Sequence, residues 1–260
     1  MTRRPIDLSQ ARVLISNDDG VHAPGIKVLE KAVRAVAREV WVVAPETEQS
    51  ATSHSLTLRR PLRIRNVSDG RFAVDGTPTD SVLLGVNRVM KDLRPDIVMS
   101  GVNRGGNLGE DVHYSGTVAA AMEGALLGIP SVAFSQEYDD NRNVIWETSE
   151  FWMPKILERL AGYDFDPAIL LNVNIPDCPP GEVTGMEVTR QGRRKIGGEI
   201  QDGRDPRGDA YYWVGVQRDE EKFQDGTDLD ACRRKVISVT PLSLDLTAGR
   251  ELEHLREVFP

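Results

Sequence analysis

Short apolar runs alternate along the chain with longer stretches of helical periodicity. An apolar run of about four to eight residues between turn residues is typical of a buried strand, whereas apolar residues spaced three and four apart indicate a helix. We predict strands at residues 12–16, 40–44, 96–100, 131–135, 168–173 and 236–240. We predict helices at about residues 25–39, 80–90, 117–127, 149–160 and 249–258. This alternation predicts an α/β fold with a doubly wound, mostly parallel sheet.

Two parts of the chain depart from this alternation. The alternating apolar side chains of residues 55–65 predict an extended segment, which is interrupted at Pro61. Residues 72–74 could pair with this segment. Residues 199–226 are charged and poor in aliphatic side chains, apart from an aromatic cluster at residues 211–213. Such a segment buries little surface by itself. We interpret it as an arm that packs on a neighbouring subunit, and a surface insertion is the alternative.

These patterns divide the chain into four parts. Residues 1–11 precede the first strand and are predicted to be a flexible extension. The α/β core is predicted to span residues 12–190, and residues 191–235 are predicted to form an oligomerisation arm. Residues 236–260, a strand and an amphipathic helix, are predicted to return to the core.

Composition limits the possible partners. The chain has 260 residues and a formal net charge of −8 at pH 7, whereas nucleic-acid-binding proteins normally carry a basic surface. We therefore expect no stable nucleic-acid complex. No stretch reaches the roughly 20 apolar residues of a membrane span, and the basic N-terminus lacks the apolar segment of a secretory signal. Cys178 and Cys232 are too few for a disulfide framework, so we expect a cytoplasmic protein without membrane contact.

The first predicted strand ends in two adjacent carboxylates, Asp18 and Asp19. In open α/β sheets ligands bind beyond the carboxyl ends of the strands, which is where these two side chains would lie. Neighbouring carboxylates repel each other, so a site that keeps both ionised usually contains a cation. An ordinary turn at Asp19-Gly20 is the alternative, because Asp-Gly is a common turn pair.

A glycine-rich loop at residues 100–118 follows the strand predicted at residues 96–100. Glycines let the backbone approach a ligand closely, and a helix N-terminus is an anion site. Ser115, Gly116 and Thr117 are therefore candidate phosphate ligands, and helix capping by Ser115 is the alternative. The loop lacks the Gly-Lys-Ser/Thr of a Walker A motif, and no Gly-x-Gly-x-x-Gly follows the first strand. We therefore expect no dinucleotide site.

The strand ends and loops together offer oxygen ligands for a metal ion. The paired aspartates provide carboxylates, Ser50 in the loop after the second strand provides a hydroxyl, and Asn103 provides an amide oxygen. Such all-oxygen surroundings suit Mg²⁺ or Mn²⁺. His54 and His113 lie in the same loops, where each could be a ligand or an acid or base, and a solvated or capping role is the alternative.

The segment Gly76-Thr-Pro-Thr-Asp80 is a further motif. Thr79 or Asp80 could cap the helix that follows, which is the simpler interpretation. A position at the edge of the ligand pocket is the alternative.

Several motifs occur in a characteristic order. In the core they are Asn17-Asp-Asp-Gly20, Val43-Ala-Pro45 with Ser50, Gly76-Thr-Pro-Thr-Asp80, Ser100-Gly-Val-Asn-Arg-Gly-Gly-Asn107 and Tyr114-Ser-Gly-Thr117. In the tail they are Val188-Thr-Arg-Gln-Gly192, Asp205-Pro-Arg-Gly208 and Ser238-Val-Thr-Pro-Leu242. From about Arg12 onward the chain closely resembles the survival protein SurE family of nucleotidases.

The resemblance implies a Rossmann-like core and a metal-dependent phosphatase. Its expected substrates are nucleoside 5′-monophosphates, often 3′-monophosphates, and in some members short polyphosphate. It also implies a homodimer or homotetramer with an exchanged C-terminal arm. The family's metal ligands, which would hold one divalent cation (Mg²⁺ or Mn²⁺), correspond to Asp18, Asp19, Ser50 and Asn103. Its phosphate-pocket residues correspond to Asn107, Ser115, Gly116 and Thr117.

The chain also departs from the family pattern beside the site. Glu46 and Gln49 stand where the family often has Asp-x-x-Arg before the serine. The loss of a positive charge at this point could weaken phosphate binding.

The hypothesis for the reaction is metal-assisted hydrolysis of a phosphomonoester. One of Asp18 or Asp19 would hold the metal and the other could take the proton of the attacking water. Amides near Ser115 and the Asn107 side chain would stabilise the developing charge. A covalent aspartyl-phosphate is the mechanistic alternative. A nucleotide- or metal-sensing module and a metal-dependent nucleotide-sugar transferase are the rival classes, since a fold does not fix function.

Overall fold

The computed structural model describes residues 4–139, 141, 143–166, 168–194, 200–214 and 224–259. Its centre is a nine-stranded sheet in the order β10-β13-β9-β7-β6-β2-β3-β5-β4. In that order the strands are Gly185–Val188, Val236–Ser243, Ile169–Ile175, Ser131–Gln136, Ile97–Arg104, Arg12–Ser16, Glu39–Pro45, Arg71–Val74 and Ile64–Ser68. The strands from β9 to β5 are parallel, and β13 and β4 pair antiparallel with the two ends of that group. The predicted mostly parallel α/β sheet is confirmed.

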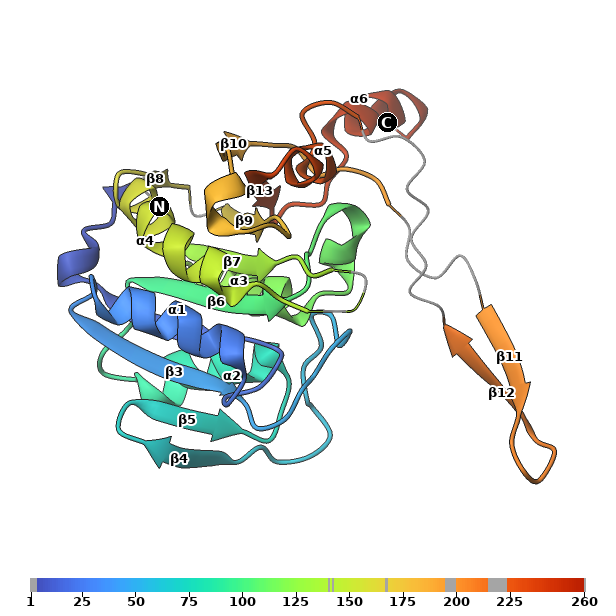
Figure 1. The fold of residues 1–260 in the computed structure, drawn as a ribbon, viewed down its shortest axis with the longest axis horizontal. Helices are drawn as coiled ribbons and strands as arrows, with labels where there is room; N and C mark the ends of the chain where they lie inside the picture. The colour runs from blue at the N-terminus through green and yellow to red at the C-terminus, as the bar shows by residue number, and fades with distance from the viewer. Residues whose placement is uncertain are drawn as a thin grey trace.

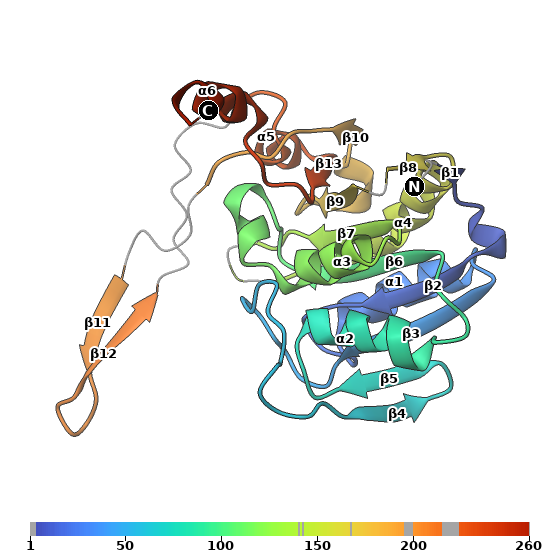
Figure 2. The same cartoon turned by 180° about the vertical axis from the view of Figure 1, so that it is seen from behind.

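Helices cover both faces of the sheet. α1 (Pro24–Arg34) and α4 (Trp146–Ala161) lie over one face (Figure 1), and α2 (Pro78–Leu84) and α3 (Gly116–Leu126) lie over the other (Figure 2). Strand β2 serves both layers, because Val13 and Ile15 belong to the core under α1 and α4, whereas Leu14 belongs to the core under α2. A strand buried on both faces is a nearly continuous apolar run, which explains why Val13, Leu14 and Ile15 predicted this strand.

The order of the parallel strands places the topological switch point of the sheet between β2 and β6. Following the chain, β2, β3 and β5 are placed successively towards one side of the sheet, and β6, β7 and β9 are then placed successively towards the other side, starting next to β2. The neighbours β2 and β6 therefore flank a topological switch point, and ligands of open α/β sheets bind outside the strand ends there. Ser16 at the end of β2 is in register with Ser100 in β6. The two segments that follow these residues carry Asp18, Asp19 and Asn103 to the same edge.

The shorter elements complete the fold. They are β1 (Arg4–Pro5), β8 (Asp164–Phe165), β11 (Ile200–Arg204), β12 (Ala210–Val214), α5 (Asp228–Arg233), α6 (Gly249–Val258), a π-helical turn at Gly85–Val89, and 3-10 turns at Leu8–Gln10, Gly109–His113 and Pro180–Glu182. Among the described helices, none combines the length and the apolar character that crossing a membrane requires.

Several boundaries differ from the prediction. α1 ends at Arg34 rather than near residue 39, because the chain already turns there towards β3. α2 begins at Pro78 and is capped by Thr77, so the prediction that Thr79 or Asp80 caps it was wrong. Of the extended segment predicted at residues 55–65, only the end joins a strand, β4, which pairs antiparallel with β5.

The N-terminal segment differs from the predicted flexible extension. From Arg4 onward the chain is attached to the body, because β1 pairs antiparallel with β8. Ile6 and Leu8 are buried in the main hydrophobic core, and burial of such side chains stabilises their attachment. Residues 1–3 lie outside the described residues.

The C-terminal part is divided differently from the prediction. β13 lies within the central sheet, so the strand predicted in residues 236–260 does return to the core. α5, which falls within the predicted arm, packs against β13 and also belongs to the core. Within the arm predicted at residues 191–235, the hairpin of β11 and β12 projects from the body (Figures 1 and 2). α6 does not return to the core as predicted, because its described side chains are all exposed.

Candidate functional site

Asp18 is the buried centre of the candidate site. It follows β2 and is only 5% exposed, and the hydroxyl of Thr117 donates a hydrogen bond to its Oδ1. Gly116 lies directly against it, since a Cβ built on Gly116 would stand 2.7 Å from the Asp18 Cβ. The predicted phosphate-binding helix terminus and the predicted metal ligand are therefore in direct contact.

Burial outweighs the nearby positive charge of Arg104 at the paired carboxylates. Burial, and then the charge of Asp19, raise the pKa of Asp18 to about 7, although the Thr117 hydroxyl opposes the shift. Burial also raises the pKa of Asp19, against the backbone N–H of Arg104, which donates to Asp19 Oδ2 at 3.1 Å. A cation between these oxygens would favour the ionised form of both groups.

The other two predicted ligands border this pair. The Ser50 loop is held beside Asp18, because the backbone N–H of Gln49 donates to the Asp18 carbonyl oxygen at 2.8 Å. Ser50 itself is exposed, and its hydroxyl donates to Glu48 Oε1 at 2.7 Å. Asn103 directly precedes the residue that contacts Asp19.

The chemistry of these donors fits a hard divalent cation. The side-chain nitrogen of Asn103 donates to the Gly105 carbonyl at 2.7 Å, so its oxygen is the end that can serve as a ligand. At the same strand ends, Ser16 Oγ, Asn17 Oδ1 and Ser100 Oγ are buried without a hydrogen-bond partner. The described residues contain no group of three or more His, Cys, Asp or Glu side chains suited to a metal. The available set is thus two carboxylates with neutral oxygens, which suits Mg²⁺ or Mn²⁺.

The turn that carries the aspartates also forms as the alternative interpretation proposed. The Asn17 side chain donates to the Gly20 carbonyl oxygen at 3.0 Å. Gly20 has a φ of 101°, which L side chains rarely adopt. The turn and the site are therefore one feature, in which the turn presents Asp18 and Asp19 at the strand end.

The N-terminus of α3 combines capping with the predicted phosphate pocket. Ser115 Oγ accepts the N–H of Val118 at 3.0 Å, so capping by Ser115 is confirmed. Thr117 uses its hydroxyl to hold Asp18. What the first turn can offer a phosphate is therefore mainly its backbone N–H groups, which lack partners within the helix.

Asn107 is held by residues that the sequence reasoning missed. Its Nδ2 donates to Ser135 Oγ at 2.7 Å, and its backbone N–H donates to Asn174 Oδ1 at 2.8 Å. Its carbonyl oxygen accepts from Asn172 Nδ2 at 2.8 Å. These bonds fix Asn107 in the loop and use one of its two side-chain N–H donors, so its predicted role in the phosphate pocket stays a prediction. The sequence could have indicated these contacts, because Ser135 in β7 and Asn172 and Asn174 in β9 are polar residues among the apolar residues of buried strands.

The remaining candidates lie at the rim. His54 Nε2 is 2.9 Å from Glu123 Oε2 of α3, which ties the loop after β3 to that helix. The His113 carbonyl oxygen accepts from the Ser53 hydroxyl at 2.7 Å. Thr77 forms a capping box with Asp80 and also donates to the Ser55 carbonyl oxygen at 2.7 Å.

A buried clamp from the tail holds the other end of the glycine-rich loop. Asp228 is fully buried and accepts N–H groups of Gly109 at 2.9 Å and Gly192 at 2.7 Å. Arg194 Nη2 lies 2.6 Å from Asp111 Oδ2, and both side chains are 4% exposed. The sequence assigned Arg194 and Asp228 to the arm, whereas the structure makes them part of the site's support.

Fold and site together define a Rossmann-like α/β protein with an acidic, oxygen-rich candidate cation site at its topological switch point. The family model described as survival protein SurE matches residues 13–198, and the chain belongs to this family. It is 58% identical to the 5′-nucleotidase SurE of Paramagnetospirillum magneticum, over 100% of both chains. It is 51% identical to the 5′-nucleotidase SurE of Rhodospirillum rubrum, over 97% of this chain and 98% of that protein.

A solved structure agrees with this assignment. The crystal structure of the SurE protein from Aquifex aeolicus matches with a TM-score of 0.84 at 38% sequence identity. The match covers 96% of this chain and 100% of that one. The resemblance inferred from the motifs is confirmed.

Proposed function

We propose that the chain is a metal-dependent phosphomonoesterase that hydrolyses nucleoside 5′-monophosphates to nucleoside and phosphate. The supporting observation is the contact of buried Asp18 with Gly116 and Thr117, which sets a cation site against an anion-binding helix terminus. The relatives named as 5′-nucleotidases support the choice of substrate. We extend the proposal to 3′-monophosphates and short polyphosphate, because the site recognises the phosphate end of its substrate.

Each residue has a role that follows from its surroundings. Asp18, Asp19, Ser50 and Asn103 would hold one divalent cation, Mg²⁺ or Mn²⁺. When bound, such a cation neutralises phosphoryl oxygens and lowers the pKa of a coordinated water. The backbone N–H groups at the start of α3 bind the phosphoryl oxygens and stabilise the charge that builds on them.

The two aspartates differ in freedom. Thr117 and Gly116 fix Asp18, so its role is to hold the cation. Asp19 is only partly buried, and its Oδ2 accepts from the Arg104 N–H. Asp19 Oδ1 is therefore the atom that can accept the proton of the attacking water.

Phosphate release from adenosine 5′-monophosphate tests the proposal. Purified protein should release phosphate with Mg²⁺ or Mn²⁺, stop in EDTA, and recover when the cation is returned in excess. A folded protein that binds the nucleotide but releases no phosphate with any divalent cation would contradict the proposal.

We further propose a homodimer or homotetramer in which the C-terminal extension packs on a neighbouring copy. On β12, Tyr212, Trp213 and Val214 are 68%, 69% and 72% exposed, and α6 exposes Leu255 and Val258. Exposed apolar patches of this kind mark protein–protein interaction sites. Light scattering coupled to size exclusion should give two or four times the mass of one chain, and a monomer mass would contradict this. Both cysteines are free and buried, which supports a cytoplasmic location.

A further inference from the structure

A small polar hollow lies beside the candidate site. It has a volume of about 230 Å³ and is lined by the loops that follow β3 and β5. Its polar lining residues include Glu46, Gln49, Thr57, Arg60, Asp75 and Thr77. Pockets that enclose a whole small molecule measure roughly 300–1,000 Å³. The hollow therefore suits one part of a substrate whose remainder lies outside it.

The walls of the hollow are continuous with the candidate site. Gln49 lines the hollow, and its backbone N–H donates to the Asp18 carbonyl oxygen at 2.8 Å. On another side Thr77 directly precedes Pro78, whose Cγ would be 3.0 Å from a Cβ built on Gly116. A phosphate at the start of α3 would thus have the hollow next to it, within reach of the group that the phosphate esterifies.

The charges of the hollow disfavour a second phosphate. Glu46 and Asp75 contribute carboxylates, and the guanidinium of Arg60 is already 3.4 Å from Asp75 Oδ2. Like charges in a confined site repel an anion. Carboxylates and threonine hydroxyls are instead good partners for a neutral group that carries several hydroxyls.

Glu46 is the residue best placed to recognise a sugar. It directly follows β3, the strand beside β2, and its carboxylate lines the hollow, where a carboxylate can accept hydrogen bonds from sugar hydroxyls. Arg65 orients its carboxylate, with Nε at 3.1 Å and Nη2 at 2.6 Å from Oε1. Both contacts use Oε1, so an incoming hydroxyl can use Oε2. We propose that the hollow binds the ribose of the nucleoside monophosphate, with Glu46 accepting from its 2′ and 3′ hydroxyls.

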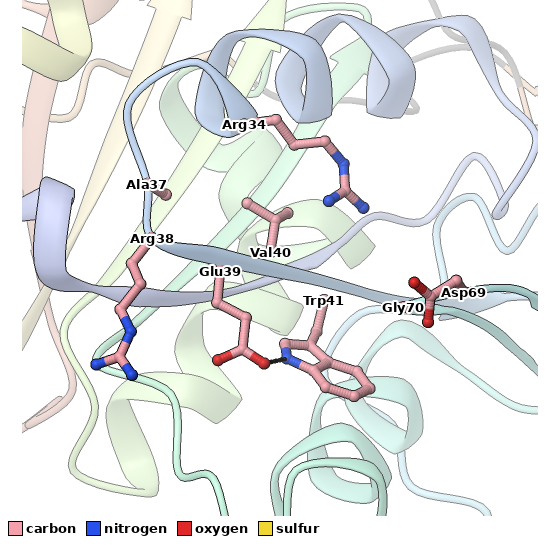
Figure 3. Close-up of a pocket in the computed structure, with 8 residues that line it drawn as sticks. All are labelled: Arg34, Ala37, Arg38, Glu39, Val40, Trp41, Asp69 and Gly70. Carbon is pink, nitrogen blue, oxygen red and sulfur yellow. Dashed lines mark hydrogen bonds between the residues drawn. The ribbon is translucent and has the colours of Figure 1, made fainter.

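This inference rests on the proposed function, and a second hollow supplies a control for it. Figure 3 shows that hollow, which is lined by Arg38, Glu39 and Trp41 among others. These residues precede or begin β3, at the opposite end of that strand from Glu46. The second hollow has a volume of about 390 Å³, and Trp41 Nε1 donates to Glu39 Oε1 at 2.9 Å within it. Since it lies at the far edge of the sheet, Arg38→Ala should leave substrate preference unchanged.

Substrates with and without the ribose hydroxyls test the inference. We would measure kcat/KM for adenosine 5′-monophosphate, for its 2′,3′-dideoxy analogue and for 4-nitrophenyl phosphate. The wild type should prefer the ribonucleotide to the dideoxynucleotide. Glu46→Ala should lower that preference roughly tenfold to hundredfold, the cost of losing hydrogen bonds to a charged acceptor. Glu46→Gln, which keeps an acceptor oxygen, should retain part of the preference.

A variant of Arg65 and the relative losses on the three substrates separate the ribose site from the phosphomonoesterase activity. Arg65→Ala removes the ion pair but keeps the Glu46 carboxylate, so it should preserve most of the preference. An unchanged preference in Glu46→Ala, or an equal loss on all three substrates, would overturn the ribose assignment while leaving the phosphomonoesterase intact. Absence of phosphate release by the wild type from every substrate would contradict the proposed function itself, and the ribose site with it.

Discussion

Replacement of Gly116 by alanine tests the contact on which the site is built. A Cβ at this position would stand 2.7 Å from Asp18 Cβ and 3.0 Å from both Asp18 Oδ2 and Pro78 Cγ. Carbon atoms in contact are normally about 3.5–4.0 Å apart, so the new methyl group is about 1 Å too close to Asp18. Pro78 stands close on another side and limits how far the new group can retreat.

The expected effects on rate and stability follow from this crowding. Overpacking of a buried site typically costs about 1–3 kcal/mol, which corresponds to a lower Tm by about 2–4 °C for each kcal/mol in a chain of this size class. A displacement of about 1 Å at a reacting centre can lower the rate about 100-fold. We therefore expect Gly116→Ala to reduce kcat/KM for adenosine 5′-monophosphate about 100-fold, measured as initial phosphate release at saturating Mn²⁺.

Gly124→Ala is a matched control in the same helix. A Cβ at Gly124 would stand 2.5 Å from Ser131 Oγ and 2.8 Å from Val98 Cβ, at a distance from the aspartates. It should lose comparable stability by thermal denaturation while keeping most of the wild-type rate. Wild-type activity in Gly116→Ala, or an equal loss of activity in Gly124→Ala, would refute the reasoning.

Three further predictions concern charge. Asp19→Asn should lower kcat by about 100-fold or more, as removal of a positioned acid–base group does, with little change in Tm; near-normal phosphate release would break the assignment. Without a bound cation, burial raises the pKa of Asp18 to about 7 in the folded state, from an ordinary value of 3.8. Because the folded state binds this proton more tightly than the unfolded state, the protonated Asp18 carboxyl contributes its full stabilisation at acidic pH. This contribution to the unfolding free energy is lost as the pH rises towards 7. Between pH 3.8 and pH 7, the unfolding free energy of the wild type should fall by up to about 4 kcal/mol relative to that of Asp18→Asn, measured by denaturant titration in EDTA. If the unfolding free energies of the two proteins change with pH in the same way, the pKa of Asp18 is not raised. Arg194→Met should cost about 3–5 kcal/mol of unfolding free energy because Asp111 loses a buried partner. As a control, loss of the exposed ion pair between Lys31 and Glu150 should lower the unfolding free energy by under about 1 kcal/mol. An equal loss of stability for the two ion pairs would contradict a stabilising role of the buried clamp.

Features that depend only on residues close together in the sequence could be predicted. Strands such as β2 are buried on both faces and are therefore mostly apolar, so the sequence shows them as short apolar runs. Asp18 and Asp19 could be proposed as site residues because two charges end such a run at the edge of the sheet where α/β proteins bind ligands. Ser115 was found because a hydroxyl residue before a helical pattern predicts a cap.

Features that depend on distant partners could not be predicted. Asp228 begins α5 and looks like an ordinary first-turn carboxylate, but it holds Gly109, which lies 119 residues earlier. Arg194 and Asp111 are 83 residues apart, and no local pattern marks either as buried. The apolar stripe of α6 correctly predicted a helix. The spacing of apolar residues indicates that the stripe needs a surface to pack on, but it does not indicate whether that surface is the core of the same chain.

Joint titration of metal binding and activity tests the central claim most directly. Metal-free protein would be titrated with Mn²⁺ while the bound ion and the release of phosphate from adenosine 5′-monophosphate are measured in the same samples. We predict that activity rises in proportion to occupancy and saturates at one tightly bound ion per chain, and that Asp19→Asn lacks both. Full activity before any ion is bound, or tight binding and normal activity in Asp19→Asn, would contradict a catalytic cation held by the paired aspartates.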